Sequence, residues 1–237
     1  DLHPRVRRQR QMCIRDSVLV TSGAIAAGKQ AVHLKTTEGQ TQAESMAIKQ
    51  ACSAIGQARL MMTYQKLFAE YNQVAAQILM TKNTIVDNLN RYNAHNTFTQ
   101  LLKMGAIPVV NENDTVAIDE LELEMGENDS LAAVVATIAN ADLLIIMSDI
   151  DGLYDSDPRQ NPDAKMIPVV REISEDIHAV AGGAGTKFGT GGMATKIHAV
   201  EIAYESDIDV VLMNGQHPKK LYELFEDKPV GTLFHKG

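Results

Sequence analysis

The sequence predicts an α/β sandwich in which the short buried strands of a parallel sheet alternate with helices. The strand prediction rests on apolar runs that are rich in β-branched residues and lack the alternation of a half-exposed strand. These runs are residues 18–20, 74–80, 107–110, 143–147 and 210–213. Longer segments of helical character separate them, at residues 48–70, 87–104 and 129–141. Strands and helices that alternate along a chain favour right-handed crossovers, with helices packed on the sheet.

Composition narrows the function classes. The chain has 237 residues, of which 45% are hydrophobic and 22% charged, as in a globular domain with a sizeable core. The net charge of −8 argues against a nucleic-acid partner, because nucleic acids are polyanions. The longest apolar stretch, residues 131–141, is too short to span a bilayer. Only Cys13 and Cys52 are present and no secretory signal is visible, so we expect a cytoplasmic protein.

Residues 1–17 differ from the rest of the chain, because five Arg fall among the first fifteen residues without helical or strand periodicity. One interpretation is a basic arm for RNA or another anionic surface. The other is a disordered tail, or sequence foreign to the native protein. We favour the second, since no other basic cluster accompanies these residues. Residues 18–237 then form the folded domain, with one half at about 18–147 and the other at about 148–237.

Polar or small residues follow four of the predicted strands, and ligands of open α/β sheets bind beyond the carboxyl ends of strands. Turn formation alone explains Asn214-Gly215. It explains residues 111–114 poorly, because four consecutive amide and carboxylate side chains exceed the needs of a turn. The residues at these ends are Thr21, Ser22 and Gly23; Asn111, Glu112, Asn113 and Asp114; Ser148 and Asp149; and Asn214 and Gly215.

Two segments combine small or polar residues with the start of a helix. Residues 22–28 predict a tight loop and a helix N-terminus, which favours a carboxylate or a phosphate, although close helix–sheet packing explains them equally well. Residues 126–130 precede an apolar helix, so Asn128 or Asp129 is a candidate N-cap. The amide of Asn128 also suits the α-amino or α-carboxylate group of a substrate, because an amide both donates and accepts.

Six Gly fall within residues 182–196, which predicts a loop that leads into a helix. The dinucleotide fingerprint is excluded because no strand precedes this segment, and the Walker A order is absent. Met193, Ile197, Val200 and Tyr204 share one helical face. Lys196 would then lie in the first turn, where its charge opposes the helix dipole unless an anion is near. We interpret Lys196 as a phosphate contact, with a solvated lysine as the alternative.

Seven blocks, in this order along the chain, together resemble the glutamate 5-kinase family. They are VTSGAIAAG (20–28), ACSAIGQARL (51–60), VVNENDTVA (109–117), GENDSLAA (126–133), SDIDGLYDSDP (148–158), TGGMATK (190–196) and VGTLFH (230–235). The resemblance implies the amino-acid kinase fold, a three-layer α/β/α sandwich around a mostly parallel central sheet. It also implies ATP-dependent phosphorylation of the γ-carboxylate of L-glutamate to glutamyl 5-phosphate, the first step of proline biosynthesis.

The resemblance further implies roles for individual residues. Lys196 would stabilise charge on the transferred phosphoryl group and Asp129 would orient the catalytic lysines. Mg²⁺ would be bound through ATP, without metal ligands from protein side chains. The half at about 18–147 would bind glutamate, through Ser22, Gly23, Asn111, Asp114 and Asn128. The half at about 148–237 would bind ATP, through Ser148, Asp149, Thr190, Gly191, Gly192, Met193, Ala194, Thr195 and Lys196.

The family pattern also sets expectations about partners and departures. It implies proline as a feedback inhibitor, a homo-oligomer and a functional link to glutamate-5-semialdehyde dehydrogenase. The family opens with a strand and a Lys-x-Gly-Ser/Thr-Ser loop, and residues 1–17 stand in their place, so we expect that loop and one catalytic Lys to be missing. A C-terminal RNA-binding-type domain is not expected. Two alternatives stay open: a non-catalytic glutamate- or nucleotide-binding fragment, and a kinase of N-acetylglutamate, aspartate or UMP.

Overall fold

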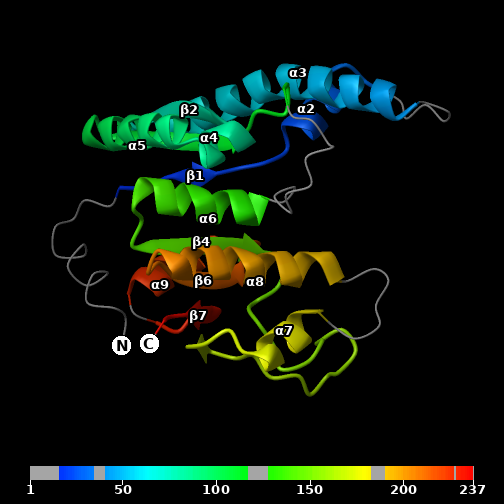
Figure 1. Cartoon of the computed structure of the whole chain (residues 1–237), viewed down its shortest axis with the longest axis vertical. Coiled ribbons are helices and arrows are strands. Elements are labelled where there is room, and N and C mark those ends of the chain that lie inside the picture. The colour runs from blue at the N-terminus through cyan, green and yellow to red at the C-terminus, as the bar shows by residue number, and fades with distance from the viewer. Residues whose placement is uncertain (1–15, 35–40, 117–127, 183–189, 227, 237) are drawn as a thin grey trace. The chain divides into compact units, whose positions relative to one another are not determined.

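The computed structural model describes residues 16–34, 41–116, 128–182, 190–226 and 228–236, so most of the predicted tail lies outside the described residues. The described residues form two compact units, the N-terminal unit within residues 16–128 and the C-terminal unit within residues 129–236. Each unit holds a sheet of its own with helices around it (Figure 1). The boundary between the two units lies between residues 128 and 129, whereas the boundary predicted from the sequence lies near residue 147.

The sheet of the N-terminal unit has three parallel strands in the order β1-β3-β2. Parallel strands end at a common edge, and Val20 pairs with Val110, so the loops after β1 and β3 leave the same side of the sheet. The strands are β1 (Leu19–Val20), β2 (Val74–Met80) and β3 (Ala106–Glu112). The helices are α2 (Ala24–Ala31), α3 (Gln42–Ala69), α4 (Lys82–Val86) and α5 (Asn88–Lys103).

A capping box fixes the start of the long helix α3. The Glu44 carboxylate accepts the backbone N–H of Thr41 at 3.0 Å, and the Thr41 hydroxyl accepts the backbone N–H of Glu44 at 3.3 Å. The hydrogen bonds from Thr41 also lower the pKa of Glu44. The expected start at residue 48 was wrong, because it followed the apolar pattern and overlooked the Thr-x-x-Glu signal.

Two glycines bring α2 and α3 closer together than any side chain would allow. A Cβ on Gly56 would lie 1.7 Å from the carbonyl oxygen of Ala24, and a Cβ on Gly28 would lie 1.8 Å from that of Cys52. Both contacts are with backbone atoms, which cannot move aside as the end of a flexible side chain can. Gly28 and Gly56 therefore hold the first turn of α2 directly against α3.

The sheet of the C-terminal unit has the order β4-β6-β7-β5, and only the β6–β7 pairing is antiparallel among the described strands. Two of its four strands, β4 and β6, were predicted, since β5 and β7 are too short to stand out as apolar runs. The strands are β4 (Leu143–Ser148), β5 (Val169–Val170), β6 (Asp209–Asn214) and β7 (Thr232–Phe234). The helices are α6 (Asn128–Ala139), α7 (Glu175–Gly182), α8 (Thr190–Glu205) and α9 (Lys220–Phe225).

The core of the C-terminal unit confirms the predicted apolar face of α8. Ile197, Val200 and Tyr204 are buried in it, and Met193 packs against it. The Tyr204 hydroxyl donates to the carbonyl oxygen of Val170 at 3.1 Å. Burial, followed by the nearby Asp209 carboxylate, raises the pKa of Tyr204 to about 12.

One buried hydroxyl connects three segments of the C-terminal unit. Thr232 Oγ1 accepts the backbone N–H of Leu153 at 2.8 Å and donates to the carbonyl oxygen of Ile167 at 2.7 Å. A Cβ on Gly152 would lie 2.7 Å from this oxygen, and a Cβ on Gly231 would lie 2.0 Å from the carbonyl oxygen of Leu212. Gly231 also has a φ of 64°, which favours glycine. These contacts explain why Gly231 directly precedes the final strand and why Thr232 begins it.

The substitution Gly56→Ala tests the packing of α2 on α3. The added methyl group would force the helices apart, so we expect the free energy of unfolding to fall by about 1–3 kcal/mol or more. Chemical denaturation measures this change. The control is Gly182→Ala at the end of α7, where an added Cβ meets no atom within 4 Å. An unchanged stability in Gly56→Ala would show that the helices can separate freely.

Tyr204 predicts a loss of stability in alkali. Its pKa lies near 10 in the unfolded chain and about 12 in the folded protein. The folded state therefore binds more protons between these values, and its stability falls as the pH rises through this window, by about 2–3 kcal/mol at most. Denaturation series at rising pH should show a shallower loss in Tyr204→Phe than in the wild-type protein. Parallel curves for the two proteins would contradict this assignment.

Candidate active site

The carboxyl edge of the N-terminal sheet carries the first residues expected to bind substrate. Ser22 is exposed in the loop after β1, and Gly23 adopts a φ of 99°, a left-handed conformation that favours glycine. Gly23 stands at the N-cap of α2 and offers no capping side chain. The first N–H groups of α2 thus present partial positive charge, which suits a carboxylate or a phosphate.

Asn111 lies inside strand β3, where a position after the strand was expected. Pairing with β2 continues through Asn111 and Glu112, opposite Leu79 and Met80, and lengthens the strand by two residues. The Asn111 side chain is buried, and its Nδ2 donates to Gln57 Oε1 at 2.9 Å. Its amide therefore contacts α3. Asn111 would affect a bound substrate indirectly, by fixing the conformation of this edge of the sheet.

Asp114 lies beyond the end of β3, as expected, and its side chain is partly buried. Its Oδ2 accepts a hydrogen bond of 2.9 Å from the hydroxyl of Ser53, a buried residue of α3. A carboxylate that is oriented in this way keeps a fixed direction for a ligand's amino group. The substrate role of Asp114 stays a prediction.

Asn128 is the first residue of α6 and is exposed, while Asp129 lies within the first turn. Neither Asn128 nor Asp129 is therefore the N-cap, because both already lie within the helix. The negative charge of Asp129 is favourable there all the same, because the helix N-terminus carries partial positive charge. Gly126 and Glu127 lie outside the described residues.

Lys196 and Asp129 form a close ion pair in the C-terminal unit. Lys196 Nζ donates to Asp129 Oδ2 at 2.8 Å, and the side chains are only 15% and 21% exposed. The pair joins the second turn of α8 to the first turn of α6. The structure thus places a cation of fixed position beside a helix N-terminus, an arrangement suited to a phosphoryl group.

The expected position of Lys196 in the first turn of its helix was wrong. Helix α8 already begins at Thr190, because Gly191 and Gly192 continue the helix in place of a loop. Gly192 and Ala194 are exposed, Met193, Thr195 and Lys196 are partly buried, and Thr195 Oγ1 donates to the carbonyl oxygen of Gly192 at 3.1 Å. Residues 183–189, with the other glycines of the segment, lie outside the described residues. The ion pair with Asp129 stabilises the charge of Lys196, which the helix dipole alone would disfavour.

A second polar group lies at the carboxyl ends of β4 and β6, where Ser148 pairs with Asn214. Asn214 Nδ2 donates to Asp151 Oδ1 at 3.0 Å, and Lys220 Nζ lies 3.9 Å from the same oxygen. The Ser148 hydroxyl donates to Asp149 Oδ1 at 3.2 Å. This edge therefore presents hydroxyl, carboxylate and amide groups close together, which suits the sugar and base of a nucleotide.

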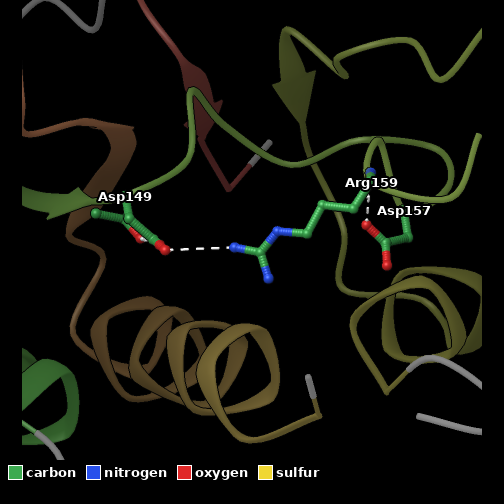
Figure 2. Close-up of polar contacts among 4 residues, drawn as sticks. Asp149, Asp157 and Arg159 are labelled. Carbon is green, nitrogen blue, oxygen red and sulfur yellow. Dashed lines mark hydrogen bonds and ion pairs between the residues drawn. The ribbon is translucent and has the colours of Figure 1, made fainter. Parts of the chain in front are cut away.

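Arg159 reaches back to this edge from the loop after β4, as Figure 2 shows. Its Nη2 lies 3.4 Å from Asp149 Oδ2, and both side chains are about 70% exposed, at 70% and 71%. The Arg159 backbone N–H donates to Asp157 Oδ1 at 2.9 Å (Figure 2). Asp157 also accepts from the Gln160 side chain at 3.0 Å, so the loop that carries Arg159 is internally hydrogen-bonded.

Three functional candidates escaped the sequence analysis, namely Ser53, Gln57 and Arg159. Ser53 and Gln57 are polar residues four positions apart on the buried face of α3. Two polar residues at this spacing, within the apolar side of a predicted helix, were the sequence pattern that could have identified them. Arg159 carried no signal, because nothing in the sequence of a Pro- and Asp-rich loop shows where it folds back.

The described residues contain no group of three or more His, Cys, Asp and Glu that could hold a metal ion. Among the same residues, no helix is long and apolar enough to cross a membrane.

Comparisons with known proteins identify the family of this chain. The model of the Amino acid kinase family matches residues 6–214. Glutamate 5-kinase from Clostridium perfringens is 46% identical over 93% of this chain and 81% of its own length. Glutamate 5-kinase from Clostridium acetobutylicum is 48% identical over 92% of this chain and 79% of its own length.

Solved structures show the same fold at low sequence identity. The isopentenyl phosphate kinase product complex from T. acidophilum covers 92% of this chain and 83% of its own, with a TM-score of 0.59 and 16% identity. Uridylate kinase from Archaeoglobus fulgidus covers 97% of this chain and 89% of its own, with a TM-score of 0.53 and 18% identity. The expected α/β class with mostly parallel sheets is confirmed. The chain belongs to the amino acid kinase family and, within it, to the glutamate 5-kinases.

Proposed function

We propose that this protein transfers the γ-phosphoryl group of ATP to the γ-carboxylate of L-glutamate, which gives glutamyl 5-phosphate and ADP. The ion pair of Lys196 with Asp129 carries the proposal on the phosphoryl side, since it holds a cation in one place within the C-terminal unit. The glutamate specificity rests on the relatives named glutamate 5-kinase, at 46% and 48% identity.

In the proposed reaction a carboxylate oxygen of glutamate forms a bond to the γ-phosphorus. The bond from that phosphorus to the β–γ bridging oxygen breaks, and its electron pair leaves with ADP. No general base is needed, because the attacking carboxylate is ionised at neutral pH. The protein contributes position and electrostatic stabilisation, as is general for phosphoryl transfer.

Each unit supplies one part of this task. In the N-terminal unit, Asp114 would bind the substrate α-amino group, and the N–H groups at the start of α2, beside Ser22, would bind a carboxylate. Asn128 is a further substrate contact in this proposal.

In the C-terminal unit, Ser148 and Asp149 would contact the nucleotide, and residues 190–195 would lie along its phosphates. Lys196 would neutralise charge that develops on the transferred group, and Asp129 would hold Lys196 in place. Mg²⁺ would be held through the phosphates of ATP, where it lowers their negative charge.

The proposed function is tested by glutamate-dependent formation of ADP with Mg²⁺, together with trapping of the acyl phosphate by hydroxylamine. We expect both signals with L-glutamate. Aspartate, N-acetylglutamate and UMP serve as competing substrates in the same assay. Turnover of one of these without turnover of glutamate would overturn the proposal, and so would binding of glutamate and ATP with no turnover of any substrate.

The substitution Lys196→Met tests the role of the ion pair. Loss of a cation that acts on the transition state should lower kcat by about a hundredfold or more, with little change in the KM for glutamate. Asp129→Asn should also lower kcat, because the lysine loses its fixed position. Lys228→Met is the matched control, since Lys228 forms an exposed ion pair with Glu226. A kcat in Lys196→Met equal to that of the control would exclude Lys196 from the chemistry.

A further inference from the structure

Helix α3 turns a polar set of side chains toward the carboxyl ends of β1 and β3. Ser53, Gln57 and Tyr64, together called the polar face of α3, are spaced by four and seven residues and so share one side of the helix. Each forms a hydrogen bond with a residue at or beyond the end of one of these strands. Polar groups on the packed side of a helix need a partner, and here each partner belongs to the edge that carries the proposed substrate site.

Ser53 acts on a residue that the proposed function places against the substrate. The side chain is 2% exposed, and its hydroxyl donates to Asp114 Oδ2 at 2.9 Å. Hydrogen bonds to ionised groups are stronger than those between neutral groups. Ser53 thus restricts the directions in which the Asp114 carboxylate can point.

Gln57 makes a similar contact one turn further along α3. Its Oε1 accepts from Asn111 Nδ2 at 2.9 Å, and both residues are buried. Its Nε2 is also buried and has no hydrogen-bond partner among the described residues. A buried donor without an acceptor costs free energy, and an apolar side chain of the same size would avoid that cost. A glutamine at this position is therefore better explained by its hydrogen bond to Asn111 than by packing.

Tyr64 completes the set at the end of β1. Its hydroxyl lies 2.8 Å from Thr21 Oγ1, and Thr21 directly precedes Ser22 and Gly23. The Thr21 backbone N–H donates to the carbonyl oxygen of Val110 at 2.9 Å, so the loop after β1 is held from the sheet and from α3. Both strand ends of the substrate side are thus tied to one helix.

We propose that Ser53, Gln57 and Tyr64 are positioning residues of the amino-acid site. They set the affinity for the amino-acid substrate by fixing Asp114, the Asn111 end of β3 and the loop that carries Ser22. This inference rests on the proposed function, because it assigns Ser22 and Asp114 to the substrate. It adds a buried layer of α3 to the groups that determine binding.

The test compares Ser53→Ala, Gln57→Met and Tyr64→Phe, each of which removes a hydrogen-bonding group and keeps most of the side-chain volume. Calorimetry with L-glutamate gives Kd, steady-state kinetics give both KM values, and thermal unfolding gives Tm. We expect Ser53→Ala to weaken glutamate binding by about tenfold, while the KM for ATP stays within about twofold. Thr63→Ala and Gln65→Met are matched controls on the exposed side of the same helix.

A double-mutant cycle separates positioning from a merely structural role. If Ser53 acts through Asp114, then Ser53→Ala adds little to the loss in binding that Asp114→Asn causes alone. Additive losses in the double variant, or a lowered Tm with an unchanged Kd in the single variants, would overturn the inference. A wild-type protein that binds no glutamate would overturn the proposed function and this inference with it. Normal glutamate binding in all three variants would overturn the inference alone.

Discussion

The close approach of α2 to α3 at Gly28 and Gly56 is the constraint on which the N-terminal unit depends. With carbonyl oxygens less than 2 Å from where each Cβ would stand, the two helices have one way to pack. That packing fixes α3 against α2, and the same helix holds its polar side chains within hydrogen-bonding distance of the strand ends. The packing also fixes the direction of the N–H groups at the start of α2. The backbone contact at Gly28 and Gly56, which contains no reactive group, therefore helps to determine where the polar groups of this unit lie.

In the C-terminal unit, ion pairs position the side chains of the candidate site. The pair of Lys196 with Asp129 is mostly shielded from solvent, whereas the pair of Arg159 with Asp149 is about 70% exposed. Exposed pairs of this kind are worth about 0–1 kcal/mol. Lys196 is thus held in place before any ligand arrives, and Arg159 is free to leave Asp149 for a better anion. The two pairs suit different tasks, one fixed and one adaptable.

The sequence predicted what local pattern controls and missed what tertiary contacts control. Strand β2 was predicted with its observed bounds, and the apolar face of α8 followed from helical spacing. The start of α8 was missed because consecutive glycines disfavour a helix that packing nevertheless continues. Asn111 was placed after its strand because pairing with β2, which extends β3, is invisible in the β3 residues alone. Ser53 and Gln57 were missed because polar residues on a helix are usually solvated, and only the fold shows their buried partners.

The Thr232 hydroxyl has a consequence for how this sequence can change over evolution. It occupies the space that a side chain on Gly152 would need, and the turn before it requires glycine at 231. The N–H of Leu153 and the carbonyl oxygen of Ile167, far away in the chain, both form their hydrogen bonds with that hydroxyl. A substitution at any one of these positions would break a contact that the others depend on. We therefore expect substitutions here to occur in pairs. Such coupling would make the final strand a slowly changing part of the chain.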